Sequence, residues 1–83
     1  MKTDSNKKPN KQVPKTFVDG VVVDCNLLNV RKRPSIVSDV VVIISNGTPL
    51  TVEDSYKNEH WYKITTATGD HGFVMKDFVA IKE

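Results

Sequence analysis

The residues of this chain that are best suited to ligand recognition are an amide, two arginines and four aromatic side chains. They are Asn29, Arg31, Arg33, Tyr56, Trp61, Tyr62 and Phe73. An aromatic ring offers a large rigid contact area at a small entropic cost, and Tyr and Trp add a polar group. Arginine pairs well with a carboxylate. These residue types favour binding over catalysis, with the aromatic side chains lining a surface site and Asn29, Arg31 or Arg33 in contact with a carboxylate of the ligand.

Catalytic and metal chemistry find little support in the same sequence. The single cysteine, Cys25, can form neither an internal disulfide nor a cysteine-based zinc site. No cysteine or carboxylate spacing around His60 and His71 completes a metal site, and nothing brings a nucleophile to Asp70-His71. We therefore expect no catalytic residue, no metal and no cofactor, with both histidines structural or facing solvent.

Strand alternation separates two of the aromatic candidates. In the run Trp61-Tyr62-Lys63-Ile64, Tyr62 and Ile64 share one face of a strand and Trp61 and Lys63 share the other. If Ile64 is in the core, a regular strand leaves Trp61 at least partly exposed, either beside a groove or at the edge of the core. For Phe73 a core position is favoured over a groove position.

The charge of the chain is divided along its length. Residues 1–15 carry five lysines against Asp4, and the rest carry seven Lys and Arg against nine Asp and Glu, so the net charge of +2 separates into +4 and −2. Residues 1–15 contain almost no apolar side chains, and we predict a flexible Lys-rich tail or linker there, followed by a folded domain over residues 16–83.

Short β-branched runs and turn residues dominate the chain from Phe17 onward. Gly, Pro, Asn and Asp separate the runs, and no stretch has the apolar spacing of a helix. The sequence predicts an all-β domain of about five to seven short antiparallel strands. Within it, we expect strands at residues 40–44, 61–66 and 71–75. Gly72 lies inside the last of these strands and has no side chain to pack, so it marks a bulge or the close approach of another backbone.

Several short motifs occur in an order and spacing that resemble the bacterial SH3-like domain. They are Leu28-Asn29-Val30-Arg31, Pro34-Ser35, Gly47-Thr48, Trp61-Tyr62-Lys63-Ile64, Gly72-Phe73-Val74 and Phe78-Val79. The resemblance extends over residues 17–81. The chain departs from the common family pattern at Arg33, at Phe73 and at Ile64. Arg31 matches the pattern and is expected to hold a loop by a salt bridge or hydrogen bond, whereas Arg33 is the better indication of an individual ligand.

The resemblance implies a small SH3-like barrel without catalytic residues. Family members usually act as accessory modules, and many are attached to cell-wall hydrolases, where a shallow groove holds a stem or cross-bridge peptide of peptidoglycan. The expected partner is such a peptide or a peptide segment of a protein, bound by a monomer. The alternative is an intracellular module that binds an acidic protein or nucleic acid through the basic tail and residues 31–33; nucleic acid is the less favoured partner because the folded part is mildly acidic.

The N-terminal residues bear on location. The start MKTDSNKKPNK has no apolar region of a signal peptide, and no apolar run approaches the roughly 20 residues that span a bilayer. No membrane association is expected. As written, the chain would stay in the cytosol; as a piece of a longer secreted protein, it would lie outside the cell or in the cell wall.

Overall fold

The computed structural model describes residues 14–82, and it is built almost entirely of strands. The strands are β1 (Phe17–Val22), β2 (Leu27–Arg31), β3 (Val40–Ser45), β4 (Pro49–Glu53), β5 (Trp61–Thr66), β6 (His71–Met75) and β7 (Val79–Ile81), with one 3-10 turn, η1 (Lys76–Phe78), before the last strand. The prediction of an all-β domain of short strands is confirmed. The tail predicted at residues 1–15 lies almost wholly outside the described residues. The described part contains no helix long and apolar enough to span a membrane.

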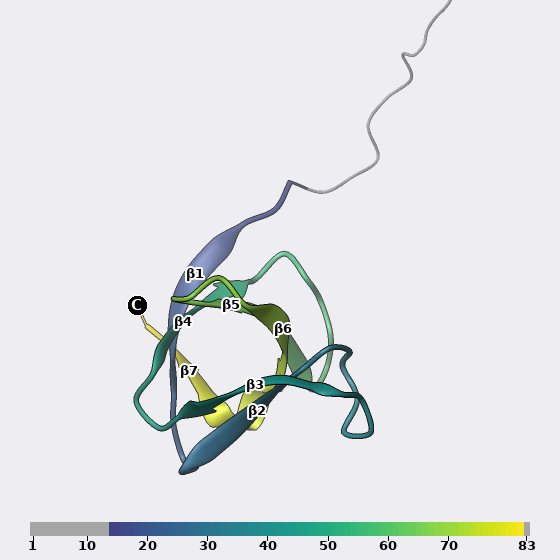
Figure 1. The fold of residues 1–83 in the computed structure, drawn as a ribbon. Helices are drawn as coiled ribbons and strands as arrows, with labels where there is room; N and C mark the ends of the chain where they lie inside the picture. Colours follow the sequence, from purple (N-terminus) through teal and green to yellow (C-terminus); the bar gives the residue numbers. More distant parts are fainter. Residues whose placement is uncertain (1–13, 83) are drawn as a thin grey trace, which may run out of the picture.

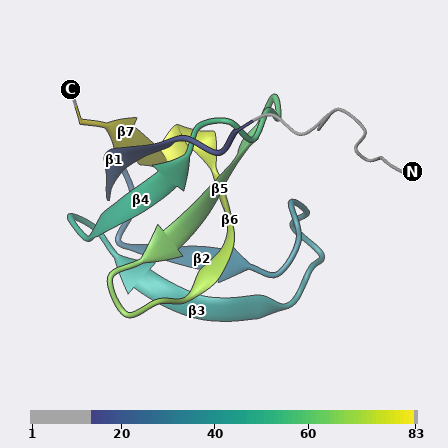
Figure 2. The ribbon, with the colours of Figure 1, turned by 90° about the horizontal axis from the view of Figure 1, so that it is seen from above.

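All seven strands belong to one antiparallel sheet in the order β3-β2-β6-β5-β4-β1-β7. The sheet curls around on itself, so that one face is enclosed and the other faces outward (Figure 1). The hairpin of β2 and β3 lies on the opposite side of the molecule from β1 and β7 (Figure 2). β2 joins the rest of the sheet through the pair Arg31 and Phe73. β3 and β7 are therefore the two edge strands.

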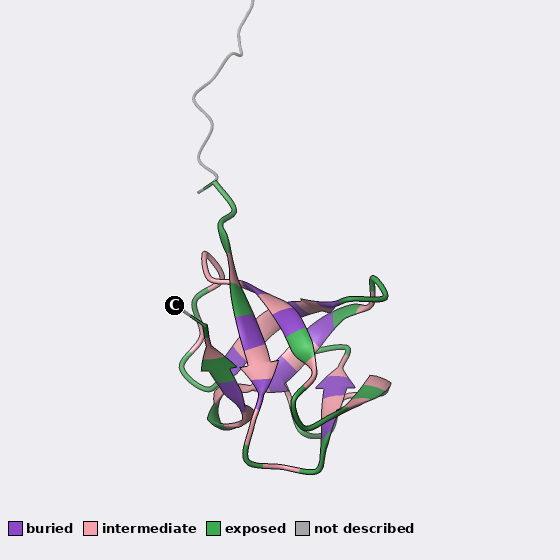
Figure 3. Ribbon diagram, turned by 90° about the vertical axis from the view of Figure 1, so that its left-hand side faces the viewer, coloured by how far each residue is buried: buried purple, intermediate pink, exposed green. Residues whose placement is uncertain are grey.

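The core occupies the enclosed face. Buried and exposed residues alternate along the strands, as the bands in Figure 3 show. The buried members form one cluster: Val22, Leu28, Val30, Leu50, Val52, Ile64, Val74 and Val79. Each buried Val, Leu or Ile contributes about 1.5–3 kcal/mol relative to an exposed position. Because these residues come from six of the seven strands, the cluster forms only when those strands are assembled into the sheet. Cys25 is half-buried and packs against this cluster.

Three glycines explain how such a short chain closes the sheet. Gly47 and Gly69 have φ values of +83° and +92°, in the left-handed region that favours glycine, at the β3–β4 and β5–β6 turns. Gly72 lies on the enclosed face of β6, where a Cβ atom would stand 2.5 Å from Val30 Cγ1 and 2.7 Å from the Arg31 carbonyl oxygen. The predicted close approach of another backbone at Gly72 is confirmed, and that backbone is β2.

Candidate ligand-binding surface

A row of side chains crosses the outward face of five strands. Its members are Phe17, Glu53, Lys63, Phe73 and Arg31, on β1, β4, β5, β6 and β2, and we call this set the outer row. The register pairs Phe17 with Glu53, Lys63 with Phe73, and Phe73 with Arg31, while Lys63 Nζ lies 3.7 Å from Glu53 Oε1. The outer row thus combines two aromatic rings with three charged groups across the sheet.

Tyr56 places a second ring beside Phe73 of the outer row. It lies in the loop between β4 and β5, and its ring centroid is 5.4 Å from that of Phe73 with the planes at 59°. A tilted pair of this kind contributes about 0.5–1.5 kcal/mol beyond the area it buries. The Tyr56 hydroxyl is within 3.4 Å of Asn58 Nδ2. Both rings are half-buried, so the pair is fixed in position and still presents part of its surface to solvent.

The two arginines of the candidate set are both held by Ser38. Arg31 Nη1 donates to the Ser38 carbonyl at 2.9 Å, and the Arg33 amide donates to Ser38 Oγ at 2.9 Å. The loop hydrogen bond expected of Arg31 is therefore present. A guanidinium has five N–H donors, so a single bond to Ser38 leaves Arg31 able to bind a ligand carboxylate as well.

The loop after β2 encloses a hollow next to these arginines. The hollow has a volume of about 430 Å³ and is lined by Lys32, Arg33, Ser35, Val37, Ser38 and Asp39. The loop is closed by a hydrogen bond of 2.9 Å from the Lys32 amide to the Asp39 carbonyl. Arg33 is exposed at this hollow, whereas Arg31 is half-buried at its junction with the outer row.

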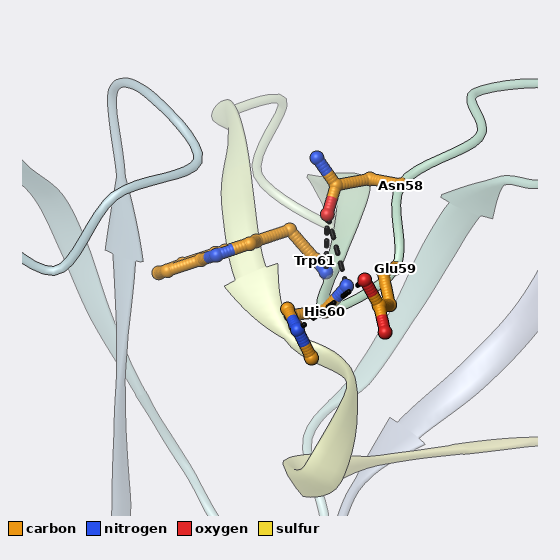
Figure 4. A network of polar contacts seen from close by, with 4 residues as sticks. All are labelled: Asn58, Glu59, His60 and Trp61. Carbon is orange, nitrogen blue, oxygen red and sulfur yellow. Dashed lines mark hydrogen bonds and ion pairs between the residues drawn. The ribbon is translucent and has the colours of Figure 1, made fainter.

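Trp61 is on the outward face at the start of β5, and of the two positions expected for it the exposed one beside a groove is wrong, whereas packing at the edge of the core agrees with its burial. Only 8% of its surface is accessible, although it does not belong to the contiguous core cluster. Asn58 Oδ1 accepts hydrogen bonds from the amides of His60 and Trp61, at 2.9 and 3.1 Å, and so fixes the entry into β5 (Figure 4). Alternation along a strand determines which face a side chain lies on, whereas other parts of the chain determine whether that face is covered.

Tyr62 and Asn29 do not contribute to the ring pair of Tyr56 and Phe73. Tyr62 packs against the core cluster from the enclosed face, with Lys76 Nζ 5.2 Å from the centre of its ring, so the sheet separates it from Phe73. Its predicted position on the same face as Ile64 is confirmed. Asn29 is half-buried on β2 opposite Ile43, on the same face as Arg31.

Comparison with known proteins agrees with this architecture. The family model of the bacterial SH3 domain matches residues 26–80, which is more than half of the chain. The chain belongs to the bacterial SH3 domain family. The match leaves out β1, which the structure places between β4 and β7 in the same sheet. Bacterial SH3 domains are in general non-catalytic binding modules. No curated protein matches the chain.

Three members of the outer row of this bacterial SH3 domain were absent from the sequence-based candidates. Phe17 was missed because β1 lies outside the recognised motifs, although 55% of its surface is exposed. Glu53 and Lys63 were missed because residues 17, 53, 63 and 73 become neighbours only through strand register. Lys63 belongs to the motif Trp61-Tyr62-Lys63-Ile64, and its outward position was a signal that could have included it.

The histidines of this bacterial SH3 domain have the surface and structural positions expected of them. His71 Nδ1 lies 3.0 Å from Thr65 Oγ1, in a cross-strand pair between β6 and β5. His60 Nε2 lies 3.7 Å from Glu59 Oε1, and both side chains are exposed (Figure 4). Among residues 14–82, no group of three or more His, Cys, Asp and Glu side chains is arranged to hold a metal ion.

Proposed function

We propose that this bacterial SH3 domain is a binding module for an extended peptide that carries a free carboxylate, such as a stem or cross-bridge peptide of peptidoglycan. The observation that carries the proposal is the half-buried pair Tyr56 and Phe73, with Arg31 on one side of Phe73 and Lys63 on the other. The pair offers a shallow apolar contact, and the two cations offer a contact for the carboxylate.

The charges of the outer row fit a ligand with groups of both signs. Glu53 is 15% exposed at its side chain and Lys63 39%, so their contact is partly shielded from solvent. A ligand ammonium group would pair with Glu53, and a ligand carboxylate would pair with Arg31 on the other side of Phe73. Peptides that carry both an amine and a carboxylate, as those of peptidoglycan do, match this order better than a uniformly acidic ligand does.

The hollow beside Ser38 extends the proposed surface. Arg33 and Lys32 line it and Arg31 borders it, so a peptide chain leaving Phe73 over Arg31 would meet further cations there. Arg33 departs from the common pattern of the family, so we assign it to the choice of an individual ligand. An Arg33→Gly variant should fold normally and bind the same peptide more weakly.

The test is co-sedimentation of the full chain with purified bacterial sacculi, followed by NMR titration with muropeptides released from them. We expect binding, with amide shifts at Phe73 and in residues 54–60. Tyr56→Ala should weaken binding about tenfold, which corresponds to about 1.4 kcal/mol, whereas Tyr56→Phe retains the ring and should bind nearly as well as the wild type. Lys63→Ala should weaken binding, whereas Lys82→Ala, at an exposed position beyond β7, should not.

A protein that stays in the supernatant and shows no shifts with muropeptides would refute the proposal. The alternative, an acidic partner or nucleic acid bound through residues 1–15 and the cations at 31–33, predicts a different result. Its affinity falls steeply with salt. It is also lost when the tail lysines are changed to glutamine: Lys2, Lys7, Lys8, Lys11 and Lys15. Peptide binding at the outer row should survive both treatments.

A further inference from the structure

β3 is an edge strand that lacks most of the features that usually protect an edge, apart from a shift in its register with β2 between Val30 and Arg31. It is six residues long, its sequence VVVIIS contains no charge and no proline, and no described strand pairs with its outer side. Soluble proteins protect edges by making them short, by placing charges or prolines on them, by β-bulges or by covering them. The other edge strand, β7, is three residues long and lies between Asp77 and Lys82. The two edges of one sheet therefore differ in whether they can accept another strand.

The backbone of β3 presents free hydrogen-bonding groups in a definite order. The register of β3 with β2 is regular from Ser45 back to Val42, and the Asn46 amide donates to the Asn26 carbonyl at 2.9 Å. Over this stretch the alternation of an antiparallel ladder turns the amide and carbonyl of Val42 and Ile44 toward β2. The same alternation turns the Ile43 amide and carbonyl to the open side. It also turns the Val41 carbonyl and the Ser45 amide to that side.

Apolar side chains surround this open backbone. On β3, Val40, Val41 and Ile43 are 43%, 44% and 53% exposed. Three more apolar side chains extend the surface on β2 and in the loop before β3: Leu27, Ile36 and Val37, each at least 66% exposed. Summed over these six side chains, the exposed area is on the order of 600 Å² per chain, against the roughly 800 Å² that each partner buries in a standard interface.

We propose that the β3 edge pairs with β3 of a second copy of this chain, around a two-fold axis at Ile43. In that register each Ile43 amide donates to the Ile43 carbonyl of the other copy, and each Ser45 amide donates to the Val41 carbonyl of the other copy. These are the same groups that the β2–β3 ladder leaves open. An antiparallel two-fold pair also brings no like charges together, because β3 carries none.

Side-chain chemistry favours a copy of this chain over another occupant. Across the two-fold axis Ile43 would meet Ile43 on the outward face, and Val42 would meet Ile44 on the enclosed face, where both are half-buried against the core. The dimer would thus continue the core across two sheets. A charged or strongly polar peptide would gain the backbone bonds but not this apolar contact. The proposal replaces the expectation of a monomer and is independent of the outer row.

The experiment is sedimentation velocity of the full chain under reducing conditions, from micromolar to millimolar concentration, paired with hydrogen exchange of individual amides. We expect a monomer–dimer equilibrium. The Ile43 and Ser45 amides should exchange rapidly in the dilute monomer and become at least tenfold more protected in the dimer. Ile43→Lys should shift the equilibrium to the monomer. Ala80→Lys adds the same charge at an exposed position on the other edge strand and should leave the equilibrium unchanged.

Ile43→Pro separates the backbone from the side chain, since it removes an amide that β2 does not use. Ile43→Thr keeps that amide and the β-branched shape. Both should favour the monomer, the proline variant more strongly. A constant monomer mass up to millimolar concentration would overturn the proposal. A second result would overturn it as well: the Ile43 and Ser45 amides become protected from hydrogen exchange only when a peptide is added, while the protein keeps the mass of a monomer.

Discussion

The two faces of the β5–β6 hairpin perform different tasks with residues that alternate along the same strands. On the enclosed face, Ile64 and Val74 are almost completely buried in a cluster drawn from six strands. On the outward face, Lys63 and Phe73 remain partly exposed and mix charge with aromatic surface. The enclosed face is constrained by volume from all sides, whereas the outward face can change its chemistry without disturbing the core. A binding site is therefore more readily altered there.

Trp61 complicates this division because it is buried on the outward face. It lies outside the contiguous core and is anchored through its amide by Asn58. The outward face thus contains one buried aromatic side chain at the start of β5. Variants on each face test whether the outward face contributes to stability independently of the enclosed face.

The largest loss of stability is expected for Gly72→Ala on the enclosed face. Its Cβ would stand 2.7 Å from the Arg31 carbonyl, which is backbone and cannot rotate away. We expect a loss of about 4 kcal/mol in the free energy of unfolding, because overpacking forces β2 and β6 apart. Urea denaturation measures it. Gly69→Ala is the matched control, with φ of +92° and open space around the Cβ, and should cost only about 1–2 kcal/mol. Equal losses would show that the close approach is not a constraint.

A smaller loss is expected for Trp61→Ala on the outward face. Removing a buried indole should cost about 3 kcal/mol, at the lower end for such a change because the ring lies outside the main cluster. Lys63→Ala on the same face should cost less than about 1 kcal/mol, since its ion pair with Glu53 is partly solvated. Urea denaturation compares the two. If both variants lose the same small amount, Trp61 does not contribute as a buried side chain.

A smaller loss than that of Trp61→Ala is expected for Asn58→Ala, in the turn before β5. The change removes the Oδ1 acceptor for the amides of His60 and Trp61 and should cost about 1 kcal/mol. Asn58→Asp keeps an acceptor at that position and should retain most of the stability. Thermal unfolding followed by circular dichroism measures both. A loss in the aspartate variant as large as in the alanine variant would contradict the role assigned to Oδ1.

Local sequence signals predicted the strands and turns of this domain well. β5 and β6 have the predicted bounds, and β3 differs only by ending at Ser45 rather than at residue 44. Gly47 and Gly69 take the positive φ that their turns need, because glycine adopts it without steric cost. Leu28 and Val30, two residues apart on β2, are both buried, in agreement with period-two alternation. These features depend on residues near one another in the chain, and for this reason the sequence alone could reveal them.

The outer row and the burial of Trp61 could not be predicted from local sequence signals. Phe17, Glu53 and Lys63 become neighbours of Phe73 only through the register of five strands, which no local pattern specifies. Trp61 is covered although alternation places it outward.

The sequence by itself determined that this chain forms short antiparallel strands, where its main turns fall and that it belongs among bacterial SH3 domains. These properties follow from local backbone preferences and from motifs readable in one dimension. Only the tertiary structure decided which outward side chains meet in the outer row, that Trp61 is covered, and that β3 rather than β7 is the open apolar edge. The physical reason is that strand pairing joins residues tens of positions apart, and burial depends on every element that packs nearby.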